Sequence, residues 1–423
     1  MTDGLVVSKK ASLIESENIM RILGCVRNTH LHGQLGGMEI ATRKLYEGLA
    51  ALGHEIKVVS TSLNDGQGKM IYQDDQGVNY AFLPNSVPGQ YSVSFHTGVR
   101  EYLLELIGTG WTPDIIHSAS AGATGVCKNS HQIPVVATWH GTFFEDHIDR
   151  MADAVFLKGR QLMPDQVERV LLNKILPMVV RGIERDRRFG VDFDGHIAIC
   201  DYLAKVLRHY GLPRDNVVSI PVSIDERFFV MRNMGKAECQ AQIGFEQPDR
   251  VVLGLVGRGV PSKGYSILYS ALKLLDPNRF AILIVGDTVS IPENIQVPLK
   301  IIRLPHAEMP FAYRAMDIYV NPTIRLSGFD MTTREALVAG IKSIVSDTSA
   351  YADFHEKFVQ EGGDQSVFGL FRNGSPDSLA NQIMRMSRMP LAGDERNLAI
   401  LESKFTDAVM IDKHIKFFNK FTL

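Results

Sequence analysis

The sequence predicts an α/β protein with two Rossmann-like, doubly wound parallel-sheet domains that face one another across a cleft. Two observations lead to this prediction. At 423 residues the chain exceeds the usual size of one hydrophobic core. In both halves, short apolar runs alternate with helical segments through short loops, which is the pattern of parallel sheets built from strand–helix units.

Composition and charge are those of an ordinary globular protein. The chain is 45% hydrophobic and 22% charged. Its formal net charge of -2 gives no reason to expect a nucleic-acid partner. The four cysteines are widely spaced and form no metal-ligand pattern, so we expect reduced thiols and no metal site.

The sequence shows no targeting or spanning segment. No stretch approaches the roughly 18 apolar residues of a membrane span. Residues 1–19 lack the apolar region of a signal peptide and are predicted to be a disordered leader. We therefore expect a cytoplasmic protein, and peripheral contact with the inner face of a membrane stays open.

The first domain is predicted to span residues 20–222. Its helix at 38–52 places Ala41, Leu45, Leu49 and Leu52 on one face and ends at Gly53. A Gly-rich loop at 30–37 precedes this helix. The predicted strands are 21–26, 55–60, 114–117, 134–139, 196–200 and 217–221.

Residues 143–190 interrupt the alternation with a long helical stretch that is rich in Met, Leu, Arg and Asp. Two interpretations are open. The stretch is either a solvated helical excursion packed on the first sheet, or an element that binds the acceptor or faces a membrane.

The second domain is predicted to span residues 223–405, joined to the first near 221–229. Ser375 and Pro376 form a typical helix start. The last helix, within 406–423, is a candidate to pack back on the first domain. The predicted strands are 251–256, 280–285, 301–302, 318–320 and 343–345, with helices at 264–275, 308–316 and 332–339.

The segment G-R-G-V-P-S-K-G from Gly257 carries two cations directly after a buried strand. Open α/β sheets bind ligands at this edge. Arg258 offers a planar fork for phosphate oxygens, and Lys263 offers a mobile point charge. The segment is neither a P-loop nor a dinucleotide fingerprint. It predicts a diphosphate site, and the alternative is a pair of ordinary surface cations.

A second segment, S-G-F-D-M-T-T-R-E from Ser327, leads into a helix. Glu335 suits acceptance of hydrogen bonds from vicinal ribose hydroxyls, although a solvated helix Glu is the alternative. Backbone N–H groups at the positive end of the helix are predicted to cradle a phosphate, namely those of Gly328, Phe329, Asp330 and Met331.

The chain resembles the family-four glycosyltransferases of the GT-B fold over nearly its whole length. Five segments in the right order carry the resemblance. They are G-G-M-E-I-A-T-R-K-L-Y-E-G-L-A-A-L-G-H-E-I-K-V-V from Gly36, T-W-H-G-T from Thr138, G-R-G-V-P-S-K-G from Gly257, M-D-I-Y-V-N-P-T from Met316 and S-G-F-D-M-T-T-R-E-A-L-V-A-G from Ser327.

The resemblance implies a role for each matched position. Arg258 and Lys263 would bind the donor diphosphate, Glu335 the ribose, and His140 the donor sugar. His140, Arg258 and Lys263 are then the candidate catalytic residues. The implied donor-binding residues are Gly36, Gly37, Gly257, Ser327, Gly328, Phe329, Asp330, Met331 and Glu335.

Two positions depart from the family pattern. Ser327 stands where a Glu is usual, and Asp330 stands where a Gly is usual. A carboxylate beside a diphosphate is electrostatically unfavourable unless it faces sugar hydroxyls or Arg325. An altered donor preference and a lost or changed catalysis are both open.

The resemblance implies a retaining transfer from a nucleotide-diphosphate sugar, with UDP or GDP as the nucleotide, to a glycan, lipid-linked or small-molecule acceptor. Cations and helix N-termini would neutralise the leaving group, so neither a metal nor another cofactor is expected. The alternatives are a catalytically silent nucleotide-sugar-binding partner of another transferase and, more remotely, a sugar-nucleotide epimerase.

Overall fold

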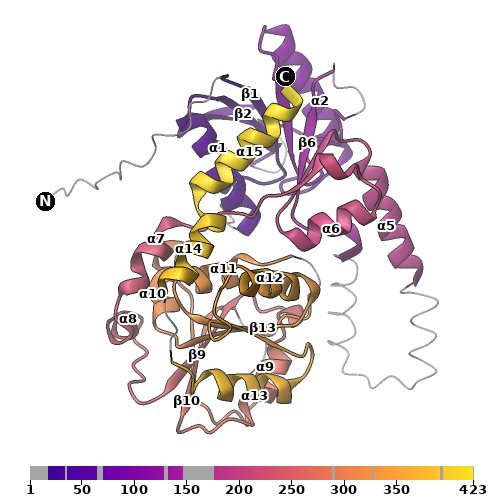
Figure 1. Ribbon diagram of the computed structural model, residues 1–423. Helices are drawn as coiled ribbons and strands as arrows, with labels where there is room; N and C mark the ends of the chain where they lie inside the picture. The colour runs from indigo at the N-terminus through magenta and orange to yellow at the C-terminus, as the bar shows by residue number, and fades with distance from the viewer. Residues whose placement is uncertain are drawn as a thin grey trace, which may run out of the picture. The chain divides into compact units, whose positions relative to one another are not determined.

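The computed structural model describes residues 18–33, 36–63, 70–127, 132–145, 176–287, 291–325, 328–390 and 394–422 (Figure 1). The chain divides into two compact units. The first consists of Met1–Thr138, Asp192–His196 and Ala408–Leu423, and the second of Trp139–Val191 and Ile197–Asp407. The expected join at 221–229 lies within the second unit.

The described residues form two sheets, and both are mainly parallel. The predicted α/β class is therefore confirmed. The larger sheet has eight strands in the order β3-β4-β2-β1-β5-β6-β7-β8. β1 pairs in parallel with β2 and with β5, as do β2 with β4 and β5 with β6, whereas β3 and β4 are antiparallel. The strands are β1 (Arg21–Cys25), β2 (Glu55–Thr61), β3 (Ile71–Asp75), β4 (Val78–Leu83), β5 (Ile115–Ala119), β6 (Val135–Trp139), β7 (Gly195–Ala198) and β8 (Val217–Ser219).

The antiparallel hairpin of β3 and β4 is absent from the sequence prediction. Its two turn residues, Gln76 and Gly77, both have positive φ, at 53° and 80°. Two-residue hairpin turns of type I′ need this geometry at both central positions, and Asn-Gly or Asp-Gly usually signals it. Gln at the first position does not indicate such a turn, so the hairpin could not be predicted from the sequence.

Helix α1 (Gly37–Ala51) confirms the predicted amphipathic segment of the first unit. Ala41, Leu45 and Leu49 are buried on one face, while Leu52 lies just past the helix. Gly53 follows with φ 93°, a conformation that L side chains rarely adopt. The helix α2 (Val93–Gly108) is capped by the Ser92 hydroxyl.

The C-terminal helix α15 (Asp407–Thr422) packs within the first unit. A Cβ added at Gly48 of α1 would lie 2.1 Å from Cδ1 of Ile411, so the two helices are in close contact. The rings of His117 on β5 and Phe418 lie 5.7 Å apart. The last helix is therefore part of the first unit's core.

The second unit holds a six-stranded parallel sheet in the order β11-β10-β9-β12-β13-β14. Figure 1 shows α11 and α12 on one face of this sheet and α9 and α13 on the other. The strands are β9 (Val251–Gly257), β10 (Phe280–Gly286), β11 (Leu299–Ile302), β12 (Ile318–Asn321), β13 (Lys342–Ser346) and β14 (Phe368–Phe371).

The strand order of this sheet reverses between β9 and β12. From β9 the chain proceeds through β10 and β11 to one edge, and from β12 through β13 and β14 to the other. Such a switch point opens a crevice at the carboxyl ends of the two strands. The helices that surround the sheet are α9 (Tyr265–Leu272), α10 (Met309–Arg314), α11 (Met331–Val338), α12 (Ser349–Gln360), α13 (Pro376–Met386) and α14 (Asp394–Phe405).

The remaining helices of the second unit precede β9: α5 (Leu176–Gly190), α6 (Asp201–His209), α7 (Glu226–Val230) and α8 (Lys236–Gln242). Residues 146–175 of the predicted helical stretch lie outside the described residues. Its last part, α5, is tied to the preceding segment by Asp186, which accepts hydrogen bonds from the N–H groups of Phe143 (2.8 Å) and Phe144 (3.1 Å). Burial raises the pKa of Asp186 to about 6.

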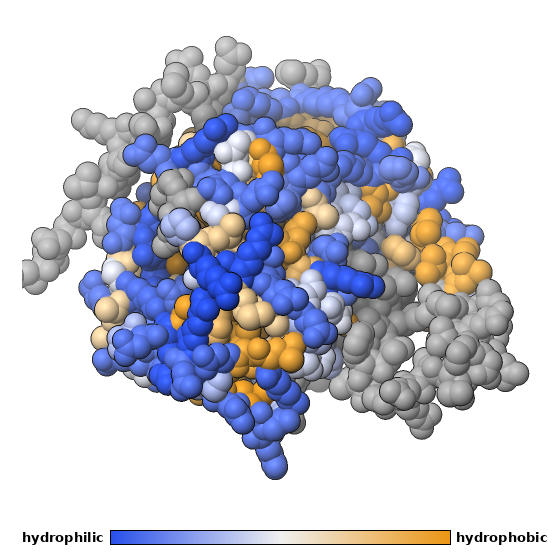
Figure 2. All heavy atoms as spheres, turned by 60° about the horizontal axis from the view of Figure 1, so that its bottom comes forward, coloured by the Kyte–Doolittle hydropathy of each residue, from blue (hydrophilic) through white to orange (hydrophobic). Residues whose placement is uncertain are grey.

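The described surface gives no indication of a bilayer-spanning element. Within the described ranges, no helix has both the length and the apolarity to cross a membrane. On the face drawn in Figure 2, hydrophilic residues surround small, separate apolar areas.

Candidate functional site

The two sequence segments with predicted chemistry meet at the switch point of the second unit. β9 ends at Gly257 and β12 at Asn321, and the two strands are neighbours. The loop after β9 contains a short 3-10 turn, η5 (Pro261–Lys263). The loop after β12 leads to α11. The structure thus brings together segments that lie about seventy residues apart in the chain.

Ser262 joins these two loops, and the sequence analysis did not identify it. It is fully buried. Its carbonyl oxygen accepts hydrogen bonds from Ile324 N (3.0 Å) and the Thr323 hydroxyl (3.1 Å). Its own hydroxyl accepts from Arg325 Nε at 3.0 Å. The loop that carries Arg258 and Lys263 is therefore held against the loop after β12.

Gly264 allows this approach. Its φ is 77°, and a Cβ at this position would lie 1.8 Å from the carbonyl oxygen of Pro322. Any side chain here would force the loops after β9 and β12 apart. The glycine is therefore required by packing as well as by backbone conformation.

Lys263 is paired within the protein. Its Nζ lies 2.9 Å from Oδ2 of Asp330, and the two side chains are 15% and 24% exposed. The same oxygen accepts a hydrogen bond from Asn321 Nδ2 at 2.9 Å. The other oxygen of Asp330 accepts from the N–H of Thr333 at 3.0 Å and caps α11.

The Asp330 carboxylate is held in its ionised form. Burial opposes ionisation, but Lys263 and the hydrogen bonds from Thr333 outweigh burial and hold the pKa of Asp330 well below its usual range. Asn321 completes the network through Thr333 Oγ1 (3.0 Å) and the Tyr351 hydroxyl (2.9 Å). The sequence shows the departure at Asp330 but not its partners.

Arg258 differs from Lys263 in its surroundings. It lies in the loop directly after β9 and is exposed. Among the residues that the structure describes, none accepts a hydrogen bond from its guanidinium. Of the two predicted diphosphate ligands, Arg258 is thus accessible and Lys263 has a carboxylate partner.

Glu335 is almost fully buried on α11, with 5% of the residue exposed. The Tyr313 hydroxyl of α10 donates a hydrogen bond of 2.8 Å to its Oε2. Burial, and then the Glu335 charge, raise the pKa of Tyr313 well above its usual range, so that its hydroxyl stays a donor. His306 Nε2 lies 3.7 Å from the other carboxylate oxygen. The sequence predicted Glu335 but neither of these neighbours.

The loop at 328–331, with the predicted phosphate-binding backbone, leads directly into α11. Ser327 lies outside the described residues. Gly328 has φ 71°, and a Cβ there would lie 3.8 Å from the carbonyl oxygen of His140. The backbone at His140, which follows β6, is therefore adjacent to this loop.

Gly36 and Gly37 belong to the first unit, at the start of α1. Both are exposed. The N–H of Gly36 donates to Glu39 Oε2 at 3.0 Å, which closes the N-terminus of the helix. Gly36 thus has a capping role within its own unit, and Gly37 is the first residue of the helix.

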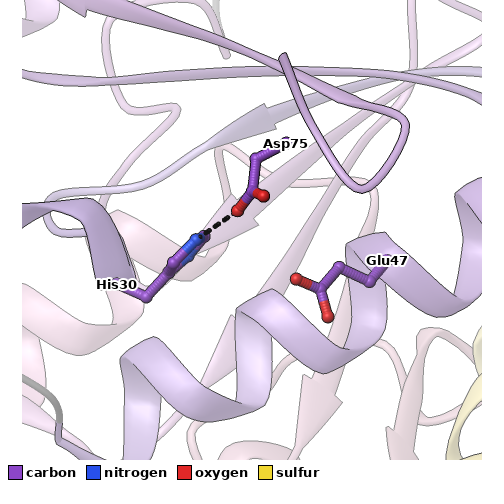
Figure 3. A group of neighbouring side chains, drawn as sticks. All are labelled: His30, Glu47 and Asp75. Atoms are coloured by element: carbon purple, nitrogen blue, oxygen red, sulfur yellow. Dashed lines mark hydrogen bonds and ion pairs between the residues drawn. The ribbon is translucent and has the colours of Figure 1, made fainter. Parts of the chain in front are cut away.

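The first unit also contains a cluster that the sequence did not suggest (Figure 3). His30, Glu47 and Asp75 present potential ligand atoms within 4.8 Å of one another. His30 Nε2 and Asp75 Oδ2 lie 2.7 Å apart, and Arg43 Nε lies 2.5 Å from Glu47 Oε1. Because Arg43 already supplies a counter-charge to Glu47, we assign the cluster to two neighbouring pairs: His30–Asp75, which joins the 3-10 turn His30–His32 to β3, and Arg43–Glu47 within α1.

Two family models match the chain. The model for Glycosyltransferase Family 4 matches residues 35–228, and the model for Glycosyl transferases group 1 matches residues 250–388. A search among curated protein sequences returned no match.

Solved structures of glycosyltransferases share the fold. Sucrose-phosphate synthase from Thermosynechococcus elongatus has a TM-score of 0.69 at 15% identity and covers 95% of this chain and 98% of its own. A glycosyltransferase from Rickettsia africae has a TM-score of 0.67 at 16% identity, with 96% and 99% covered. Alr3699/HepE of Anabaena, in complex with UDP and glucose, has a TM-score of 0.65 at 14% identity, with 95% and 99% covered. With two parallel-sheet domains and both family models matched in order, this chain belongs to the family-four glycosyltransferases of the GT-B fold.

Proposed function

We propose that this glycosyltransferase moves a sugar from a nucleotide-diphosphate donor to an acceptor hydroxyl with retention of configuration. One observation carries the proposal: the loop after β9, which bears Arg258 and Lys263, contacts through the Lys263–Asp330 pair the start of α11, the helix that bears Glu335. Two cations and a carboxylate at this edge suit a diphosphate joined to a hydroxyl-bearing ribose. The structure of Alr3699/HepE with UDP and glucose supports UDP as the first nucleotide to test.

In the proposed reaction, the bond between the anomeric carbon and the diphosphate oxygen breaks while the acceptor oxygen bonds to the same face. The acceptor proton passes to an oxygen of the departing diphosphate. Arg258 and Lys263 neutralise the charge that develops on this leaving group. Glu335, oriented by Tyr313, holds the ribose, and His140 contacts the donor sugar. These cations do the work of a metal, so we propose a metal-independent reaction.

We extend the proposal to the acceptor and the cell compartment. The acceptor is a glycan, a lipid-linked sugar or a small molecule. The protein acts in the cytoplasm, and peripheral contact with the inner membrane face is compatible with this location.

The test is nucleotide binding by an Arg258→Ala, Lys263→Ala double variant. Each charged hydrogen bond contributes about 1.5–3 kcal/mol, so losing both is expected to weaken binding of UDP or GDP at least about 100-fold. Isothermal titration calorimetry measures the dissociation constants. A melting temperature close to that of the unaltered protein would show that the fold is intact.

The control is an Arg250→Ala, Lys236→Ala double variant. Arg250 directly precedes β9, and Lys236 pairs with Asp317 at 2.5 Å before β12. Both cations therefore lie at the amino ends of the strands, away from the proposed site. Equal affinities in the unaltered protein and the Arg258/Lys263 variant would refute the site assignment.

The Lys263–Asp330 pair favours a second candidate, a catalytically silent nucleotide-sugar-binding partner. An internally paired cation is less available to a leaving group, and Ser327 replaces the usual Glu. Sugar transfer or donor hydrolysis by the purified chain alone would eliminate this candidate. This candidate would be established if the chain alone binds the donor tightly without turning it over, and turnover appears when a second transferase is added.

A further inference from the structure

The N-terminus of α11 is a place where an anion is favoured, and a carboxylate of the protein is already there. The helix runs over eight residues, from Met331 to Val338. Its unpaired N–H groups and its dipole attract negative charge. Oδ1 of Asp330 accepts the N–H of Thr333 at 3.0 Å. A helix cap alone is common, so the neighbouring side chains decide what this carboxylate does.

Two further donors converge on the same carboxylate from other elements. Lys263 Nζ, in the loop after β9, is 2.9 Å from Oδ2. Asn321 Nδ2, at the end of β12, is also 2.9 Å from Oδ2. An ammonium group, an amide and a helix N–H form a donor set that suits a phosphate group as well as a carboxylate.

The position of this donor set indicates whether it serves the protein's own carboxylate or a phosphate group of a ligand. Lys263 and Asp330 lie 67 residues apart in the chain and meet only because β9 and β12 are neighbours at the switch point. This is the crevice in which an α/β sheet binds its ligand. Arg258, in the same loop as Lys263, is exposed and has no side-chain acceptor among the described residues.

We propose that the Asp330 carboxylate is a built-in substitute for a donor phosphate, and that a nucleoside diphosphate binds by drawing Lys263 away from Asp330. This inference rests on the proposed function. Arg258 makes the first contact with the incoming diphosphate, and Lys263 then exchanges its carboxylate partner for a phosphate oxygen. Asp330 therefore lowers the affinity of the site for nucleotides.

The same charge discriminates between product and donor. A free nucleoside diphosphate has a terminal phosphate that is mostly doubly ionised near pH 7, because the second pKa of a phosphate monoester is about 6. The sugar-linked donor lacks this additional charge. Asp330 repels the product more strongly than the donor and so favours release of the product.

The experiment compares Asp330→Asn with the unaltered protein. Asn caps a helix about as well as Asp, so the substitution removes the charge and keeps the cap. Calorimetry would measure the dissociation constants of UDP, GDP, UDP-glucose and inorganic pyrophosphate. We expect UDP and pyrophosphate to bind at least about tenfold more tightly to the variant, and UDP-glucose to gain less than UDP.

Asp317→Asn is the matched control. Asp317 also pairs with a lysine, at 2.5 Å from Lys236, and its Oδ2 accepts a backbone N–H at 2.7 Å. It lies at the amino end of β12, whereas Asp330 lies beyond the carboxyl end. The nucleotide affinities of this control should stay unchanged.

The outcomes separate the inference from the proposed function. If UDP binding depends on Arg258 and Lys263 but Asp330→Asn, folded as judged by its melting temperature, binds no more tightly, the inference is wrong and the function stands. If UDP and pyrophosphate bind more tightly to the variant but UDP-glucose binds to neither protein, the inference stands and the nucleotide-sugar function is wrong. An absence of binding by every ligand to both proteins overturns both.

Discussion

Replacing Arg334 with alanine should lower the free energy of unfolding of the second unit by about 3–5 kcal/mol. Arg334 is 1% exposed on α11. It donates hydrogen bonds to the carbonyl oxygens of Val222 (3.2 Å) and Ile199 (3.0 Å), and its guanidinium lies over the ring of Phe329. Alanine leaves both buried carbonyl groups without this donor and opens a void.

Denaturant unfolding followed by circular dichroism measures the effect. Arg334→Met should lose less stability than Arg334→Ala, because it fills the space and removes a buried cation whose pKa burial lowers to about 10. Arg372→Ala, at an exposed position of the same unit, should change stability by less than about 0.5 kcal/mol. A similarly small change for Arg334→Ala would show that the buried contacts of Arg334 are not stabilising.

Acid should destabilise the first unit between pH 6.5 and pH 4. Burial lowers the pKa of His196 and of His414 to about 4, whereas an unfolded His titrates near 6.5. In this interval the unfolded chain binds more protons than the folded one, so lowering the pH favours unfolding. Each histidine is expected to remove on the order of 2–3 kcal/mol of stability as the pH falls from 7 to 4.5.

His414→Leu tests this expectation. The variant loses the hydrogen bond from Nδ1 to the Met410 carbonyl oxygen (2.8 Å), so its stability at pH 7 will drop somewhat. The difference in stability between pH 7 and pH 4.5 should nevertheless shrink by about 2–3 kcal/mol. His209→Gln, at an exposed position, is the control. An unaltered pH dependence in His414→Leu would contradict the buried neutral state of this histidine.

The sequence predicts those elements whose burial requires a recognisable order of apolar residues along the chain. Val251–Val256 is a continuous apolar run because the strand is covered on both faces, and β9 is confirmed there. The positions of Arg258 and Lys263 after this strand follow from the same pattern. The β3–β4 hairpin was missed because its turn depends on a positive φ at Gln76, which residue type does not indicate.

The partners within the site could not be predicted. The Lys263–Asp330 contact depends on β9 and β12 being neighbours, and strand order is not encoded in local periodicity. Tyr313 and His306 reach Glu335 from separate segments of the chain for the same reason. The sequence thus identifies which groups border the switch point, whereas tertiary pairing decides which of them are already neutralised.

The placement of α15 affects how this protein can be synthesised. Gly48 and Gly195 are packed against Ile411 and Phe417 of that helix, so the apolar surfaces around them stay uncovered until α15 leaves the ribosome. The first unit, although its translation begins before that of the second, cannot complete its core until the second unit has been translated. Fragments that stop short of this helix should accumulate as aggregates, and chaperones are expected to hold the nascent chain until α15 has been translated.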